Sequence, residues 1–219
     1  MSEPANGFEF LTRFRQTNGN WAPKYSDFLR YLENKARQKK VPAAGQVELT
    51  SPDGQSGLPA ETWKGLMRQA WEAGMIQATL TGADRLAGPV FEELFLYLHS
   101  LGCQVSVVMD GASLDEERIR FFMEHMPLAI QVTGSVRNEI CEAIDIGLPI
   151  RMEGVDGLEG GTEQPLFILD WNGTMKACGR TDGTTADVLR DGFPAAWEKI
   201  SGEGDSRTEA EGKPCVSVI

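Results

Sequence analysis

The chain has 219 residues, 41% of them hydrophobic, which is enough for one core of ordinary size. The formal net charge of −11 is uneven: residues 1–44 carry eight Lys and Arg against four Asp and Glu, so the remainder is near −15, which argues against nucleic acid as partner of the main body. The sequence has no apolar run of membrane-spanning length and no signal-peptide pattern at MSEPANGFEF, so we expect a cytoplasmic protein with no membrane partner.

Residues 1–44 are predicted to form an N-terminal arm that ends in a basic helix. Helical spacing of apolar side chains indicates the helix, and its members are Tyr25, Phe28, Leu29 and Leu32. Lys and Arg gather at the end of this helix, where they complement the negative end of the helix dipole. A docking site for a polyanion or a peptide is the alternative interpretation of the same residues.

Residues 45–153 alternate between strand and helix patterns. The predicted strands are 46–50, 75–82, 104–111, 128–134 and 149–154, and the predicted helices are 59–74, 88–102, 114–126 and 136–147. Strands that alternate with helices of this length form βαβ units, and therefore a parallel sheet with right-handed crossovers. The pattern predicts an α/β fold, a partial (β/α) TIM-type barrel of about five parallel strands with helices outside.

The character of the chain changes after residue 153. Segment 154–200 begins with a Gly-rich linker, continues as a predicted hairpin that turns at Asn172-Gly173, and ends in an amphipathic helix interrupted at Gly192 and Pro194. Residues 201–219 have the acidic, Gly- and Ser-bearing composition of a disordered tail.

Several motifs resemble those of the radical SAM superfamily. Thr81-Gly82-Ala83-Asp84-Arg85 and Met109-Asp110-Gly111 stand where that family has Thr-Gly-Gly-Glu-Pro and Thr-Asn-Gly after its second and third strands. FILDWNGTMKAC followed by GFPAAWEKI is similar to the SPASM-type C-terminal extension. The resemblance covers about residues 46–200 and implies a barrel that binds S-adenosylmethionine next to an iron–sulfur cluster, and often a peptide substrate.

The cluster ligands of the family are missing from this sequence. Where the family has Cys-x-x-x-Cys-x-x-Cys after its first strand, this chain has Ser51-Pro52-Asp53-Gly54-Gln55-Ser56-Gly57, and one carboxylate cannot replace three thiolates. Cys178 is a solitary remnant of the auxiliary-cluster ligands. We therefore expect a shortened, degenerate member with no metal site, no catalytic residue of the family type and no cofactor, unless the turn belongs to an unrelated barrel.

The resemblance also implies a vestigial S-adenosylmethionine turn. Its residues are Gly82, Ala83 and Asp84, with Asp110 on the next strand. Gly82 and the acid are kept from the family pattern, but without a cluster iron the ligand loses its main anchor. A vestigial pocket is therefore expected rather than a working one.

Two functions remain open at this point. The first is an accessory or binding protein for a peptide or for an active paralogue. The second is an enzyme that binds S-adenosylmethionine or another small molecule without a cluster, at strand ends that carry Asp53, Asp84, Asp110 and Arg137. A decayed gene product is a third reading. A short barrel leaves open sheet edges, and a homo-oligomer is one way of covering them.

Overall fold

The computed structural model describes residues 41–51, 53, 57–82, 89–134, 138–152, 166–178 and 181–202. The predicted basic helix and Gly-rich linker lie outside these residues, as does the predicted tail 201–219 except for its first two residues, of which Ser201 is helical. The strands are β1 (Ala44–Glu48), β2 (Gln77–Thr81), β3 (Gln104–Asp110), β4 (Ala129–Thr133), β5 (Ile150–Met152), β6 (Phe167–Leu169), β7 (Thr174–Ala177) and β8 (Thr185–Asp187). The helices are α3 (Ala60–Glu72), α4 (Pro89–Ser100), the 3-10 turn η1 (Gly111–Ser113), α5 (Glu116–Glu124), α6 (Asn138–Asp145), α7 (Val188–Asp191) and α8 (Phe193–Ser201).

The described strands form one open sheet in the order β5-β4-β3-β2-β1-β6-β7-β8. Strands β1 to β5 pair in parallel with their sequence neighbours, which confirms the predicted α/β class and its five parallel strands. The predicted hairpin is also present, because β6 and β7 pair antiparallel. The sequence does not predict two further features: β6 pairs in parallel with β1, and a short strand, β8, extends the sheet beyond β7.

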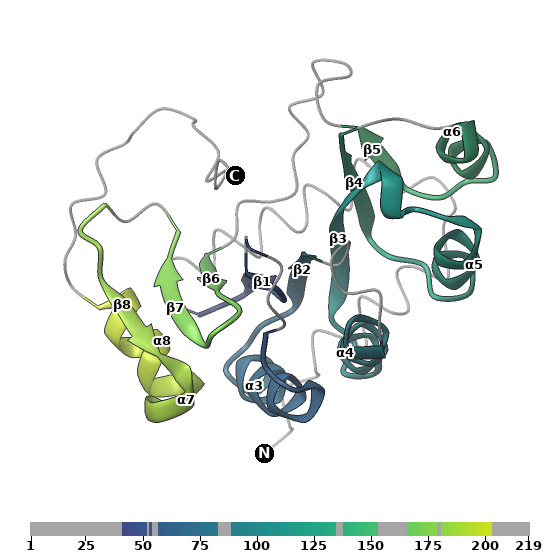
Figure 1. Ribbon diagram of the computed structural model, residues 1–219. Helices are drawn as coiled ribbons and strands as arrows, with labels where there is room; N and C mark the ends of the chain where they lie inside the picture. The colour runs from purple at the N-terminus through teal and green to yellow at the C-terminus, as the bar shows by residue number, and fades with distance from the viewer. Residues whose placement is uncertain are drawn as a thin grey trace.

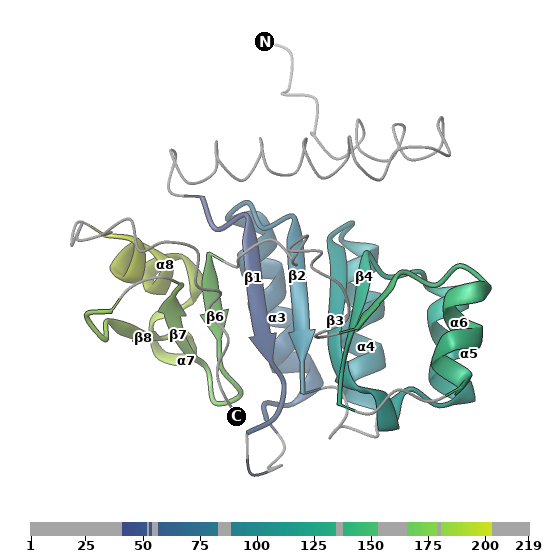
Figure 2. The same ribbon diagram turned by 90° about the horizontal axis from the view of Figure 1, so that it is seen from above.

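The two faces of the sheet differ in chemistry. Helices α3 to α6 lie along one face of the strands, and α8 joins them beside α3 (Figures 1 and 2). Strand residues on this face are apolar and buried, for example Val47, Leu80, Val107 and Ile130. The alternate residues on the opposite face are mostly polar, and within the described chain no helix lies over that face (Figure 1).

Aromatic side chains fill the space between the helices and the sheet. Trp63, Phe91, Phe95 and Phe122 are fully buried, and Phe121 and Trp71 are partly buried against them. The rings of Phe91 and Phe122 meet edge to face with centroids 6.2 Å apart. These aromatic residues are therefore packing groups between the helices and the sheet.

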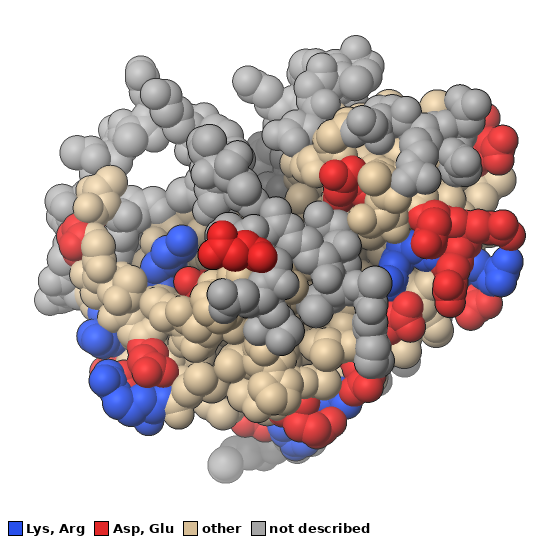
Figure 3. Space-filling model, in the orientation of Figure 1, with Lys and Arg blue, Asp and Glu red and all other residues tan. Residues whose placement is uncertain are grey.

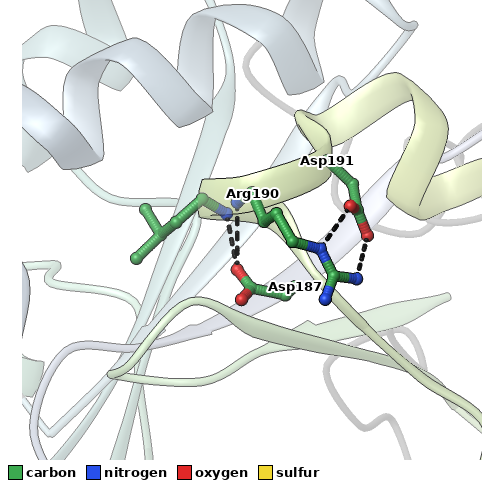
Figure 4. Close-up of polar contacts among 4 residues, drawn as sticks. Asp187, Arg190 and Asp191 are labelled. Atoms are coloured by element: carbon green, nitrogen blue, oxygen red, sulfur yellow. Dashed lines mark hydrogen bonds and ion pairs between the residues drawn. The ribbon is translucent and has the colours of Figure 1, made fainter.

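A second set of helices packs beside the hairpin. Figure 4 shows how α7 begins: Asp187 Oδ1 accepts hydrogen bonds from the backbone N–H groups of Leu189 and Arg190, at 2.9 and 3.1 Å. Arg190 then holds both carboxylate oxygens of Asp191, at 2.7 and 2.9 Å. The helix is interrupted at Gly192, whose φ of +75° favours glycine, as the sequence predicts. Pro194 does not interrupt it, since it lies in the first turn of α8, where a missing N–H costs little.

None of the helices in the described segments has the length and apolarity needed to cross a bilayer. Charged side chains are spread over the face seen in Figure 3, with acidic groups gathered on the side of α5 and α6. The described acids of these helices and the caps before them are Asp115, Glu116, Glu117, Glu124, Glu142 and Asp145.

Candidate functional site

The carboxyl ends of the parallel strands carry a row of polar side chains on the face opposite the helices. Glu48 of β1 pairs in register with Thr81 of β2, and Asp110 of β3 pairs with Thr133 of β4. In a parallel sheet, residues in register point to the same face. Residues two or four positions apart along one strand also share a face, so all four of these side chains lie on one face. All four are half-buried. This row at the strand ends is the candidate site.

The threonine hydroxyls in this row are engaged with the backbone. Thr81 Oγ1 donates to the carbonyl of Val47 and Thr133 Oγ1 donates to the carbonyl of Met109, each at 3.4 Å. Both bonds run to the neighbouring strand on one side, so they tie adjacent strand ends together. The groups that remain for chemistry are the carboxylates.

Asp110, which the sequence predicts as a site residue, has a structural role. Its Oδ1 accepts a 2.7 Å hydrogen bond from the N–H of Ala112 and so begins the turn η1. A Cβ at Gly134 would lie 3.3 Å from the same oxygen, so the turn after β4 runs close beside the carboxylate. The other acid at this end, Asp170, is similar: its Oδ1 accepts a 3.1 Å bond from the N–H of Asn172 in the hairpin turn.

Glu48 differs from these two acids because it holds no turn together. Its Oε1 accepts a 3.2 Å hydrogen bond from the side-chain amide of Gln46 on the same strand. Burial raises the pKa of the Glu48 carboxyl above its ordinary value of 4.5. The positive charge of Lys176 and the Gln46 bond oppose that rise in pKa, whereas the negative charge of Asp170 adds to it.

The turn that follows β1 packs closely against the strand ends. Thr50 and Ser51 are 7% and 3% exposed. A Cβ at Gly57 would collide with the backbone oxygen of Leu49 and lie 3.0 Å from that of Trp171 in the hairpin turn. The chain's own backbone therefore occupies the space beside the end of β1.

Gly82 is the described part of the predicted S-adenosylmethionine turn. Its φ is +75°, and a Cβ there would lie 2.5 Å from Thr50 Oγ1, which donates a long 3.4 Å bond to the Gly82 carbonyl. Glycine is therefore needed both for the backbone conformation and for the contact with Thr50. Ala83, Asp84 and Arg137 lie outside the described residues, and Asp53 is exposed in the turn after β1.

The three described cysteines lie away from this turn. Cys103 precedes β3, at the amino ends of the parallel strands; it is 3% exposed, and burial raises the pKa of its thiol to about 12. Cys178 follows β7, which runs antiparallel, so it too lies at the opposite end of the sheet, where its N–H bonds to the carbonyl of Leu166 at 3.0 Å. Cys141 is exposed on α6. Across the described ranges, no three His, Cys, Asp or Glu side chains are grouped so that they could hold a metal ion.

Sequence reasoning missed Glu48 and Lys176 as site residues. The sequence motifs point to acids in turns, whereas Glu48 lies inside a strand. The signal was present in the alternation of polar and apolar residues in QVELT, QATLT and AIQVT. Parallel strands that are buried on both faces read as continuous apolar runs, so this alternation indicates a polar face.

No protein-family model matches the sequence. A PqqA peptide cyclase from Streptomyces rochei is 32% identical over 78 residues, which are 34% of this chain and 21% of that protein. Over that part, the chain is distantly similar to radical SAM enzymes. The matched segment thus spans about a fifth of the length of that relative.

One solved structure similar to this chain is that of SuiB from Streptococcus suis bound to S-adenosylmethionine. The alignment covers 69% of this chain and 38% of the SuiB chain. Its sequence identity with this chain is 12% and the TM-score is 0.39.

The desolvation of Glu48 gives a prediction about stability. The raised pKa in the folded state means that folding disfavours the charged carboxylate, so the contribution of Glu48 to stability becomes more favourable as the pH falls from neutral toward 4.5. Glu48→Gln removes this cost and is expected to have a higher Tm than wild type at neutral pH, with a difference that shrinks as the pH is lowered. Thermal unfolding of both proteins at about pH 7 and about pH 5 measures this. A Tm difference that is independent of pH would show that burial of the charge is not its cause.

Proposed function

We propose that this protein is a radical SAM-like binding protein that lacks iron–sulfur chemistry and acts as an accessory protein by holding a peptide. The observation that carries the proposal is the turn after β1. It contains no cysteine, and the first cysteine of the whole chain is Cys103. A cluster needs several thiolates on one site. Cys103, Cys141 and Cys178 belong to no group of three possible metal ligands within the described residues.

The packing of the turn supports the same proposal. The backbone near Gly57 is pressed against Leu49 and Trp171, and Thr50 is buried against Gly82. The residues at the end of β1 therefore do not fit an iron–sulfur cluster, either by chemistry or by space.

Two observations support a peptide as the ligand of this protein. A relative that matches part of the chain is named for its action on a peptide. In addition, the face opposite the helices presents amide, hydroxyl and charged groups, such as Gln46, Glu48 and Gln131, which can bond to a peptide's main chain and side chains.

Two measurements test the proposal. The protein is incubated under strictly anaerobic conditions with iron and sulfide and then desalted. We expect a colourless sample with the same low iron content as a Cys178→Ser variant that is treated identically. Stoichiometric iron and sulfide with visible charge-transfer absorption would overturn the proposed loss of the cluster.

The peptide part is tested with a displayed library of random peptides of about twelve residues, passed over the immobilised full chain. We expect recurrent sequence features among the retained peptides. A library that is not enriched above an unloaded support would overturn peptide binding.

A second candidate function is an enzyme that binds S-adenosylmethionine or another small molecule at the strand ends without a cluster. The observation in its favour is Glu48, because a half-buried carboxyl with a raised pKa at such a position is typical of acid–base groups. Calorimetric titration with S-adenosylmethionine distinguishes the two functions. Micromolar binding would favour the enzyme, and the absence of heat and of a Tm increase would favour the binding protein.

A further inference from the structure

The amino ends of the parallel strands carry a small apolar cluster that is distinct from the main core. Its buried members are Ala43 and Leu166, which are 5% and 7% exposed. Three side chains that remain partly exposed pack against these two: Val41, Ile76 and Trp197. Within the described chain, no helix or strand lies beyond the amino ends of β1 to β4 (Figure 2). An apolar cluster at such a border is stabilised when another apolar segment covers it.

The described part of the chain begins at this same border. A Cβ built at Gly74, in the turn before β2, would collide with Cγ1 of Val41. The carbonyl of Ala43 accepts a 2.9 Å hydrogen bond from the N–H of Ile76, at the start of the next strand. Residues 25–40 therefore join the rest of the chain beside the amino ends of β1 and β2.

The helix ends at this border carry an excess of negative charge. The last turns of α3, α5 and α6 contain no basic residue, and they contain Glu72, Glu124 and Asp145. These helices lead into β2, β4 and β5, so their carboxyl ends, where the helix dipole is also negative, lie at the amino ends of those strands. The last turn of α8, on the other side of β1, differs because it contains Lys199. The border from β1 to β5 therefore favours a positively charged partner.

Residues 25–40 have the chemistry and the length that this border requires. Their apolar side chains at helical spacing are Tyr25, Phe28, Leu29 and Leu32. Their bases are Arg30, Lys35, Arg37, Lys39 and Lys40, against two acids, Asp27 and Glu33. A helix over these residues is about 24 Å long, and the four strand spacings from β1 to β5 amount to about 19 Å. A helix that ends beside β1 can therefore reach every strand as far as β5.

We propose that residues 25–40 form a helix that covers the amino ends of β1 to β5. Its apolar side chains pack on the cluster around Ala43, and its bases lie beside the last turns of α3, α5 and α6. This inference does not depend on peptide binding. It makes the basic helix a part of the fold whose charge is matched by acids of the same chain, and not a docking site for a polyanion or a peptide.

The first test joins lysine and carboxylate groups that touch each other, by means of a carbodiimide, which forms an amide between them without a spacer. An equal mixture of unlabelled and isotope-labelled full-length protein is used, so that links within one molecule are distinguished from links between two. Within one molecule, we expect the lysines of residues 35–40 to be linked to Glu72. At the other end of the helix, Lys24 is expected to be linked to Asp145. No link is expected to Asp53, which is exposed in the turn at the opposite ends of the strands.

The ion pair between Lys64 and Glu61, whose Nζ and Oε1 atoms are 2.8 Å apart, is the internal control for this reaction. If the lysines of residues 35–40 are linked to carboxylates only between labelled and unlabelled molecules, a second copy of the chain covers the border and the inference is wrong. Links to Asp53 as frequent as those to Glu72 would also overturn it. So would the absence of any link from residues 35–40 in a sample that contains the control link.

The second test measures amide hydrogen exchange in two full-length variants. Leu32→Ser changes the apolar side of the predicted helix, and Asn34→Ser is the matched control on its opposite side. The amides of Ile76 and Leu166 are bonded at the amino ends of the strands. They are expected to exchange about tenfold faster in Leu32→Ser than in wild type, because the helix leaves these ends more often. The amide of Leu49, which is bonded at the carboxyl end of β1, is expected to change little.

The exchange rates also define the results that contradict the inference. Unchanged rates at Ile76 and Leu166 in Leu32→Ser would show that the segment does not cover the amino ends. The same acceleration in Asn34→Ser would show that the apolar side of the helix makes no specific contact. Equal acceleration at both ends of the strands would reflect a general loss of stability, and it would refute a contact confined to the amino ends.

Discussion

Replacing Phe122 with alanine is expected to lower the free energy of unfolding by about 3–5 kcal/mol. The Phe122 ring is fully buried between α5 and the sheet and makes contacts with three other rings. Its centroid is 6.2 Å from that of Phe91, 5.9 Å from Phe95 and 5.6 Å from Phe121. The variant loses the burial of this side chain and leaves a cavity that the neighbouring rings cannot easily fill. Equilibrium unfolding in urea measures the change.

The adjacent residue provides the control. Met123 is 49% exposed, and Met123→Ala is expected to change stability by no more than about 0.5 kcal/mol. Because both substitutions put alanine in the same helix, propensity differences between them are small. Similar losses for the two variants would contradict the packing described for α5.

The second large effect is expected at Gly45 in β1. A Cβ at this position would collide with the ring of Phe167 on β6. That ring cannot move aside freely, because its centroid is 5.2 Å from that of Phe193 and 6.0 Å from that of Trp197. Gly45→Ala is therefore expected to destabilise the protein by about 1–3 kcal/mol through overpacking.

Gly65 on α3 is the matched control for Gly45. No atom lies within 4 Å of a Cβ built at Gly65. Gly65→Ala is expected to stabilise the protein by about 1 kcal/mol, because alanine is the better helix former. A loss of stability for Gly45→Ala together with a gain for Gly65→Ala would support the close packing of β6 against β1. A stabilising effect at both positions would show that β6 does not lie against Gly45.

The local fold could be predicted because its signals are local. The strand at β2 is bounded by Gly74 and Gly82, and α4 is framed by Pro89 and Gly102, so their limits can be read from the sequence. The position of β6 could not be predicted in this way. The pattern of PLFILD indicates a strand but not its partner, and its pairing with β1 depends on contacts across the whole domain. Strand β8 has only three residues, Thr185–Asp187, with little strand propensity.

The candidate site was predictable in part. The resemblance to radical SAM motifs directed attention to Gly82 and Asp110, and the structure places both at the carboxyl ends of neighbouring strands. In the structure both residues also have a structural role. Gly82 packs closely against Thr50, and Asp110 caps the turn η1. Glu48 has no ion-pair partner among the described residues, and the charges that act on it come from residues as distant in sequence as Asp170 and Lys176.

The pairing of β1 with β6 has a consequence for biosynthesis. Gly45 is in register with Phe167, which is added about 120 residues later. At about 5–20 residues per second, the first strand waits several seconds on the ribosome before its second neighbour exists. During that interval one edge of β1 is open to other nascent chains, so a chaperone that shields early strands should increase the yield of this protein more than that of proteins with shorter-range pairing.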